Sequence, residues 1–317
     1  MSAYIIRRLL LLIPTVFLVG LIIFVLVQLV PGDVVDMLFS QMTYHFKERD
    51  LEAIKEAMGI GVPSYIQFGR WIGGLFHGDL GNSLWSGRPV VDEIIPRLSV
   101  SAELSLMALL VGLIISIPIG IYAAMRQDTW GDYIGRTFAT VLLCLPTFWV
   151  GIMVMVYPSV WWDWTPPVQY IPFAKNPAGN LLQFLIPAVI LGMYLAGTTM
   201  RMTRSMMLEV LRQDYIRTAW SKGLKERTVV MRHALKNALI PVLTLIGIMT
   251  PFLIGGTVVV EQIFSLPGVG RLLMQAIGHR DYVVLAGVNV FIAGFILIVN
   301  LIVDLSYAYL DPKIRYR

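Results

Sequence analysis

Charged residues are scarce in this chain, and cysteine is nearly absent. Of its 317 residues, 57% are hydrophobic and only 14% are charged, where a typical soluble domain has about 25%. The single cysteine, Cys144, excludes an intrachain disulfide and a cysteine-based metal site. The shortage of charge is too large for a soluble core to explain, so we interpret most of the chain as surrounded by lipid.

The sequence also lacks the motifs that carry chemistry. No G-x-x-x-x-G-K-[ST] stretch is present, so no loop of backbone amides can hold nucleotide phosphates. Neither a Ser/His/Asp set nor a carboxylate pair stands out, and the four histidines have no ligand spacing: His45, His77, His233 and His279. We therefore expect no catalytic, cofactor-binding or metal site, and hence no enzyme. The net charge of +5 comes from loops, which indicates membrane topology rather than nucleic-acid binding.

Six apolar runs are long enough to cross a bilayer as helices, which takes about 20 residues each. They cover roughly 9–30, 101–124, 134–157, 181–200, 238–260 and 283–309. The first run is longer than a signal-peptide core and no cleavage site follows it, so we expect a retained span. Pro251 predicts a kink in the fifth run. The sequence therefore predicts an all-α polytopic membrane protein with about six transmembrane helices.

Lysine and arginine near the ends of the runs set the expected orientation. Arg7 and Arg8 predict a cytoplasmic N-terminus, and six spans return the C-terminus to the same side. The expected organisation is an N-terminal region with the first span (1–30), an external segment (31–98) and a core of five spans (99–317). A cytoplasmic loop at about 201–237 lies within that core and has nine Lys/Arg against three acidic residues.

This loop has a helical pattern rather than the composition of a simple tether. Four residues recur at spacings of three and four, which predicts one shared helix face: Leu208, Leu211, Tyr215 and Ala219. Gly223 predicts the end of that helix, and a second helical stretch begins near Glu226. Such a face suits a helix docked into a groove on a partner protein. An amphipathic helix resting on lipid headgroups is the alternative.

Other residues in or near the apolar runs have less specific interpretations. Asp304 and Asn300, in the sixth run, fit helix packing better than a proton or substrate site. Glu261 and Gln262, at the outer end of the fifth run, are candidates for the substrate path, although interface anchoring explains them equally well. Small residues at every fourth position of the second run predict close helix packing: Gly112, Ser116, Gly120 and Ala124.

Several short motifs occur in one order along the whole chain. The loop contains Tyr215–Leu224 (YIRTAWSKGL) and Arg232–Pro241 (RHALKNALIP). The other motifs are Val30–Asp33, Gly78–Ser83, Phe264–Arg271, Arg280–Tyr282 and Asp311–Arg315. With these motifs the sequence resembles the permeases of binding-protein-dependent ABC importers. It is most similar to the dipeptide/oligopeptide/nickel transport family, and within it to the first of the two paired permease subunits.

The resemblance implies a type I ABC importer permease fold in a prokaryotic inner membrane, with both termini cytoplasmic. It implies an ATP-driven, binding-protein-dependent importer, in which this chain forms half of the translocation path. The implied partners are a second homologous permease, two cytoplasmic ATPase subunits that carry ATP and Mg²⁺, an external solute-binding protein and membrane lipid, but no nucleic acid.

In the family the cytoplasmic loop inserts into a cleft of the ATPase. By position, the residues implied at or around this contact are Tyr215, Arg217, Thr218, Ala219, Gly223, Leu224 and Arg232. Trp220 stands where the peptide branch usually has arginine.

Two other function classes remain open at this point. An ion-gradient-driven secondary transporter also lacks a nucleotide motif, but it usually shows inverted repeats and charges at the membrane midplane, and neither is evident. An intramembrane enzyme would need polar catalytic groups at membrane depth. Within the importer class, peptides are expected from the family, and nickel complexes or other small solutes are the alternatives.

Overall fold

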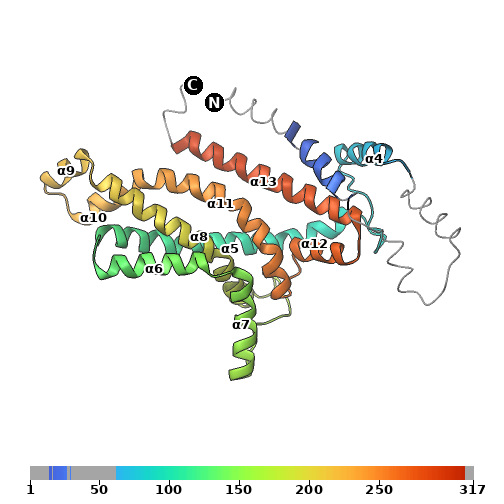
Figure 1. The fold of residues 1–317 in the computed structure, drawn as a ribbon, viewed down its shortest axis with the longest axis horizontal. Helices are drawn as coiled ribbons and strands as arrows, with labels where there is room; N and C mark the ends of the chain where they lie inside the picture. Colours follow the sequence, from blue (N-terminus) through green and yellow to red (C-terminus); the bar gives the residue numbers. More distant parts are fainter. Residues whose placement is uncertain (1–13, 16, 27–28, 30–61, 311–317) are drawn as a thin grey trace. The chain divides into compact units, whose positions relative to one another are not determined.

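The computed structural model describes residues 14–15, 17–26, 29 and 62–310 of the chain (Figure 1). Most of these residues are helical and turns or irregular segments connect the helices, and the one bridge of β type among them pairs Asn82 with Pro89. The first helices are α4 (Ser64–Phe76), α5 (Val90–Met125), α6 (Trp130–Cys144), α7 (Thr147–Trp162) and α8 (Pro177–Leu211). The later ones are α9 (Asp214–Ser221), α10 (Glu226–Thr228), the π-helical turn η1 (Val229–Ala234), α11 (Leu235–Ile263), α12 (Val269–Gly278) and α13 (Tyr282–Leu310).

Among the described residues, four helical stretches are long and apolar enough to cross a membrane. They are Val90–Met125, Pro177–Leu211, Glu226–Ile263 and Tyr282–Leu301. A bent pair, α6 with α7, makes a fifth if it is counted as one span. Of the first predicted span, a short apolar helix over Phe17–Leu26 is described. The rest of that span, and the side chain of Asp304, lie outside the described residues.

The chain divides into two compact units that share α5 and α13. The first contains Met1–Ser101 and Pro267–Ile298, and the second contains Ala102–Leu266 and Val299–Arg317. In the first unit the side chain of Asp281 is 2% exposed. It accepts hydrogen bonds from Ser83 Oγ (2.6 Å) and from the Trp85 backbone N–H (3.2 Å), while the Trp85 ring stacks on His279 at 4.2 Å. Two of the motifs noted in the sequence therefore meet, although about 200 residues separate them.

Small residues let α5 and α8 pack closely in the second unit, as the sequence predicted. A Cβ placed on Gly120 would lie 2.8 Å from Thr203 Cβ, and one on Gly192 would lie 2.6 Å from the Ala108 carbonyl oxygen. Distances below 3.0 Å leave no room for a side chain. Ser116 is fully buried as well, so this stripe serves helix packing.

The third apolar run is not one uninterrupted helix, and the prediction of a single helix over 134–157 is wrong. α6 ends at Cys144, α7 begins at Thr147, and the two helices meet at an angle of 90°. The reason lies at Pro146, because a proline disfavours helical geometry for the residue before it. Leu145 accordingly has an extended backbone, with φ −80° and ψ 121°.

The fifth run keeps both of its prolines inside one helix. Pro241 and Pro251 lie within α11, which extends over 29 residues. Figure 1 shows α11 changing direction partway along its length, in accord with the kink that Pro251 predicts. The η1 turn directly precedes α11, so the loop and the fifth span form one nearly continuous helical stretch from Glu226 to Ile263.

Candidate functional site

The cytoplasmic loop predicted from the sequence folds as a short helix, a tight turn and a second helical start. α8 ends at Leu211, and Gln213 is extended with ψ 148° before α9 begins at Asp214. The four residues predicted to share one helix face therefore lie on two helices, so that prediction is wrong. The backbone turns at Gln213 because α9 starts a new hydrogen-bonded run there, with the Ile216 N–H bonded to the Gln213 carbonyl at 3.1 Å.

Gly223 ends the α9 segment, as the sequence predicted. Its φ is +75°, a left-handed conformation that glycine adopts without steric cost. No heavy atom lies within 4 Å of where its Cβ would be, so the backbone conformation and not crowding requires glycine. Its N–H bonds to the Trp220 carbonyl at 2.9 Å, which closes the end of the helix.

The inner face of α9 is buried against the chain itself. Ile216 is 0% and Ala219 is 8% exposed, and both belong to one apolar cluster with Met207 of α8 and Val229 and Ala234 of η1. A surface contact by Ala219 is therefore not available in this structure. The prediction placed this residue at the partner surface, but the amphipathic pattern turns its small side chain inward, where it lets α9 pack closely.

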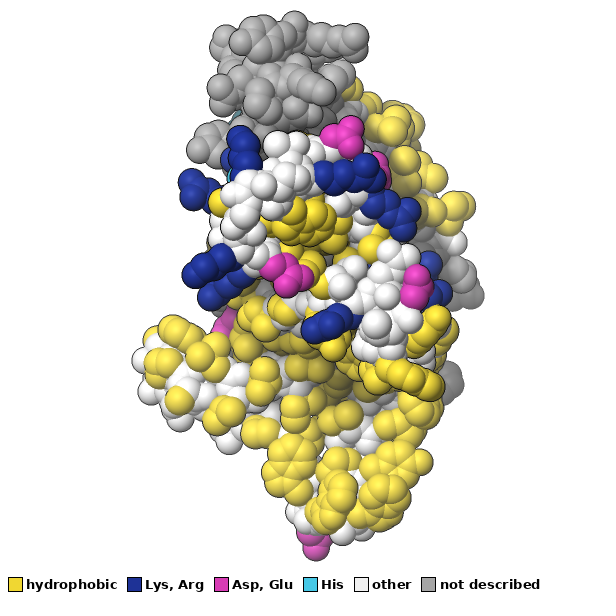
Figure 2. Space-filling model, turned by 90° about the vertical axis from the view of Figure 1, so that its left-hand side faces the viewer, with side chains coloured by type: hydrophobic (Ala, Val, Ile, Leu, Met, Phe, Trp, Pro, Cys, Tyr) yellow, Lys and Arg dark blue, Asp and Glu magenta, His cyan; other side chains and the backbone are white. Residues whose placement is uncertain are grey.

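The outer face of α9 and of the following turn presents aromatic and apolar side chains to solvent. Tyr215, Trp220 and Leu224 are 44%, 43% and 39% exposed. Figure 2 views the end of the molecule that carries α9 and α10 and shows apolar side chains enclosed by lysines and arginines. The exposed basic residues of this segment are Arg212, Arg217, Lys222, Lys225, Arg227, Arg232 and Lys236. An apolar patch with a polar rim is the anatomy of a protein interface.

Two of the predicted site residues also make contacts within the chain. Tyr215 Oη accepts a hydrogen bond from Asn237 Nδ2 at 2.8 Å, which ties α9 to the first turns of α11. Thr218 is exposed, and its hydroxyl donates to the Asp214 carbonyl at 3.0 Å. α9 is thus fixed to α11 by one polar contact and by the buried cluster beneath it. A displacement of α9 would act directly on α11.

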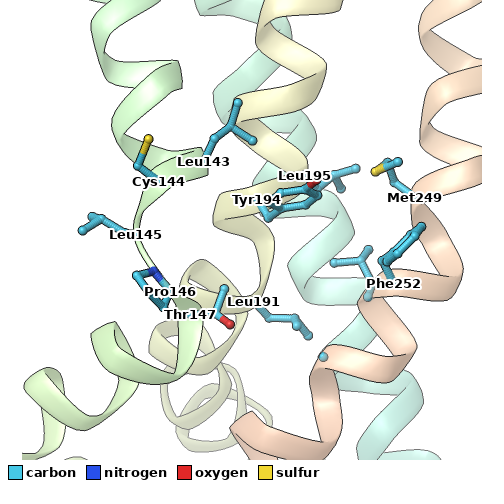
Figure 3. A pocket seen from close by; sticks show the side chains of 12 residues that line it. Leu143, Cys144, Leu145, Pro146, Thr147, Leu191, Tyr194, Leu195, Met249 and Phe252 are labelled. Carbon is cyan, nitrogen blue, oxygen red and sulfur yellow. The ribbon is translucent and has the colours of Figure 1, made fainter.

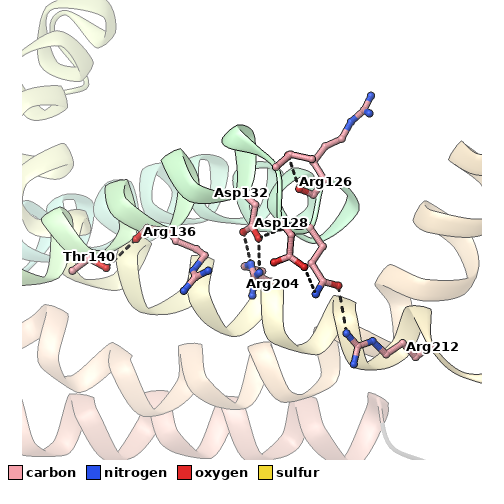
Figure 4. Close-up of polar contacts among 9 residues, drawn as sticks. Arg126, Asp128, Asp132, Arg136, Thr140, Arg204 and Arg212 are labelled. Carbon is pink, nitrogen blue, oxygen red and sulfur yellow. Dashed lines mark hydrogen bonds and ion pairs between the residues drawn. The ribbon is translucent and has the colours of Figure 1, made fainter.

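A buried ion pair joins α6 to α8, and no pattern in the sequence pointed to it. Arg204 of α8 donates from Nε and Nη2 to the two carboxylate oxygens of Asp132 in α6, both at 2.6 Å (Figure 4). The Asp132 side chain is 0% exposed and also accepts from the Asp128 N–H at 3.1 Å. The positive φ of Asp128, 60°, is held by this contact. Through Asp132, the pair connects the 126–130 turn to α8, two helical turns before α8 ends.

The candidates for the substrate path at the outer end of α11 have different surroundings. Glu261 is 0% exposed, so a solute cannot reach its side chain in this structure, and its role in the substrate path stays a prediction. α11 ends two residues later, and the Leu266 N–H bonds to the Glu261 carbonyl at 2.9 Å. Gln262 remains exposed. Within the described part of the chain, no group of three or more His, Cys, Asp or Glu could hold a metal ion.

Relatives of this chain are found over its full length. The family model for the inner membrane component of binding-protein-dependent transport systems matches residues 116–316, and the model of its N-terminal region matches residues 1–105. A putative peptide transport system permease protein of Brucella abortus is 40% identical over 316 residues, with 100% of both chains covered. The oligopeptide transport system permease protein AppB of Bacillus subtilis is also 40% identical, over 321 residues and 100% of both chains. The glutathione transport system permease protein GsiC of Salmonella paratyphi A is 38% identical over the same coverage.

The fold is also found among solved structures. The MetNI methionine ABC transporter in an inward-facing conformation matches with a TM-score of 0.55 and 15% identity, covering 69% of this chain and 96% of that chain. This similarity shows the permease fold, while the full-length relatives show the family. The chain therefore belongs to the family of inner membrane components of binding-protein-dependent transport systems, as a multi-pass permease subunit that works with ATPase and substrate-binding partners and is not itself an enzyme.

Proposed function

We propose that this permease carries peptides into the cell. The observation that supports the substrate class is identity of about 40% over the whole chain to proteins named for the transport of peptides, oligopeptides and glutathione, itself a tripeptide. Within such an importer the chain forms one half of the translocation path and a second, homologous permease forms the other. An external solute-binding protein delivers the peptide.

The outer face of α9 and its turn is the surface that we assign to the ATPase. Tyr215, Trp220 and Leu224 supply exposed apolar groups, Thr218 is exposed as well, and Arg217 and Arg232 are among the exposed basic residues around them. Burial of these apolar side chains would stabilise the docked complex, and the basic residues around them favour a partner groove with negative charge. Ala219 and Gly223 contribute indirectly: Ala219 packs α9 against the buried cluster, and Gly223 ends the α9 segment.

The chain then works by alternating access, in which the path opens to one side of the membrane at a time. Nucleotide bound at the distant ATPase sites shifts the balance between the two states. Two ATPases bind ATP with Mg²⁺ and close, and the docked α9 moves with them. The buried cluster under Ile216 and the Tyr215–Asn237 hydrogen bond pass this movement to α11. The Asp132–Arg204 pair makes α6 follow α8. Hydrolysis then resets the ATPases and the helices return.

The proposed orientation places the loop and both termini in the cytoplasm. The segment 201–237 has nine Lys/Arg against three acidic residues, and the positive-inside bias assigns it to the cytoplasmic side. Arg7 and Arg8 assign the N-terminus to the same side. The orientation is tested by adding an epitope tag to each end and comparing antibody access in spheroplasts before and after permeabilisation.

Copurification tests the docking surface. The tagged chain is purified with its partners in mild detergent, and the companions are identified by mass spectrometry. We expect a second permease and P-loop ATPases with the native chain, and loss of the ATPases alone from a Trp220→Asp, Leu224→Asp variant. The matched control is Trp130→Asp, which changes an 83% exposed tryptophan in the loop predicted on the same side of the membrane. Recovery of ATPases from the α9 variant at the level of the control would contradict the assignment.

A further inference from the structure

A cavity of about 450 Å³ opens between the break of α6 and α7 and the helices α8 and α11 (Figure 3). Five consecutive residues of the break, 143–147, form one wall. Tyr194 and Leu195 of α8 and Met249 and Phe252 of α11 form others. All of these residues belong to the second compact unit. The volume lies within the range of pockets that bind small ligands, about 300–1,000 Å³.

The cavity lies at the middle of the helices that line it. Tyr194 is the central residue of the 35-residue α8, and Met249 is the central residue of the 29-residue α11. The break at Leu145 and Pro146 is likewise at the centre of the apolar run 134–157. Three elements therefore bring their central parts to one space, and all three of these parts lie inside runs that the sequence predicts to cross the membrane.

A proline lies in each of the two helical elements that face each other across this space. On one side Pro146 separates α6 from α7, and on the other Pro251 lies in α11 between Met249 and Phe252. A proline has no N–H, so the carbonyls of Leu142 and Gly247, four residues earlier, lose their usual helical donor. At the 90° break the Leu145 N–H bonds to the Val141 carbonyl and the Val150 N–H bonds to the Pro146 carbonyl. The last carbonyls of α6 and the first N–H groups of α7 have no partner of the regular helical kind within their own helix.

Broken backbone at this depth cannot face lipid. Each unsatisfied polar group in hydrocarbon costs several kcal/mol, about 2–7 on transfer scales, so irregular backbone at membrane depth occurs only against protein or beside water. The 143–147 segment borders the cavity, a space that water or a solute can occupy. The remaining walls are apolar and aromatic. Main-chain polar groups beside apolar walls match a ligand that has amide groups and an apolar side chain.

We propose that this cavity is a subsite of the translocation path that receives the apolar side chain of a transported peptide, while the carbonyls at the end of α6 face the peptide's amide groups. The proposal rests on the proposed peptide function and adds a place and a side-chain class to it. It also moves the expected substrate contacts from the outer end of α11 to its centre.

Filling the cavity provides the first test. Met249→Trp puts a larger side chain on the cavity wall, whereas Ile248→Trp changes the neighbouring residue, which is 57% exposed and outside the cavity lining. Uptake of dileucine and of diglycine is measured with the reconstituted complex, each relative to the native complex. We expect Met249→Trp to lower dileucine uptake at least tenfold and diglycine uptake less than threefold, and Ile248→Trp to change both less than twofold.

The outcomes separate this proposal from the proposed function. Equal losses of both peptides in Met249→Trp, or no loss, would overturn the side-chain subsite while leaving a peptide importer in place. Absence of uptake of either peptide by the native complex would overturn both. Recovery of partner subunits is measured in parallel, so that a failure of Met249→Trp to assemble is recognised. In that event Phe252→Trp, at a side chain 66% exposed on the same wall, replaces it.

The native Cys144 provides an independent test that needs no change to the cavity. It lines the cavity, and it is the chain's one cysteine. In proteoliposomes we expect a charged methanethiosulfonate to modify Cys144 and dileucine to slow that reaction, with a Cys144→Ser complex as the blank. Reaction with a lipid-soluble maleimide only would show that the groove faces lipid and would overturn the proposal.

Discussion

Removal of one partner of the Asp132–Arg204 pair should destabilise the chain strongly. In Asp132→Ala the guanidinium of Arg204, whose side chain is only 18% exposed, loses both of its 2.6 Å hydrogen bonds. Breaking a buried pair in this way costs about 3–5 kcal/mol, and the partial exposure of Arg204 places the expected cost near 3. For a unit of 150–250 residues each kcal/mol lowers the melting temperature by about 2–4 °C, so a fall of roughly 6–12 °C follows.

The double variant Asp132→Leu, Arg204→Met distinguishes two free energies. One is the destabilisation caused by a single unpaired buried charge, and the other is the net contribution of the ion pair to stability. Replacement of both partners by apolar residues is often neutral for stability. We therefore expect the double variant to be more stable than the single variants Asp132→Leu and Arg204→Met. The assay is thermal unfolding of the purified complex followed by tryptophan fluorescence, arranged as a double-mutant cycle. The control is Arg217→Ala, which removes an exposed 3.8 Å pair with Asp214 and should cost less than about 1 kcal/mol. A loss in Asp132→Ala no larger than in this control, or additive losses in the double variant, would refute the reasoning.

Three further predictions concern packing and coupling. Gly120→Leu would place atoms within 3 Å of Thr203, and overpacking of this kind costs about 1–3 kcal/mol, so the yield of assembled complex and its melting temperature should fall. Gly223→Ala forces a left-handed conformation on a residue with a Cβ at a cost of about 1–2 kcal/mol, and copurification should show weaker retention of the ATPases. Tyr215→Phe removes the 2.8 Å bond from Asn237, worth about 1 kcal/mol, and should lower the peptide transported per ATP hydrolysed while the ATPases stay bound.

The helical class and the approximate positions of the apolar helices could be predicted because hydropathy depends only on composition along the chain. The predicted runs 181–200 and 238–260 lie inside α8 and α11. Their ends could not be predicted in the same way. α8 continues to Leu211 and includes Arg201, Arg204 and Glu209. A helix can extend beyond its apolar run when its polar side chains are paired or face solvent.

The break in the third run shows why proline could not be interpreted from the sequence alone. Pro187 and Pro251 stay inside α8 and α11, whereas Pro146 separates two helices at 90°. The difference depends on whether neighbouring elements satisfy the freed carbonyl and support the bend, and one sequence does not contain that information. The Asp132–Arg204 pair was missed for a related reason, because 72 residues separate its members and nothing local links them.

The candidate coupling surface was predictable in part. Gly223 follows from turn chemistry, and Tyr215 and Leu224 were named from the family resemblance, while the burial of Ala219 within the chain was not predicted. A spacing of three and four identifies a face, but it does not say whether that face turns to a partner or to the same chain. The cluster under α9 decides this question, because Val229 and Ala234 come from η1 and cover Ala219.

A single helix connects the proposed docking surface on α9 with the proposed subsite in the cavity. The segment that begins at η1 contacts α9 through its apolar cluster and through Asn237, and α11 then reaches the central cavity at Met249. A π-helical turn inside a helix holds one extra residue and is often found at functional sites, and η1 lies between α9 and the cavity. Pro251 weakens the helix again at the cavity itself. Movement of α9 can therefore change the cavity wall by rotating or shifting one helix between two points of reduced rigidity, without displacement of α5 and α8, whose glycine contacts leave no space for sliding.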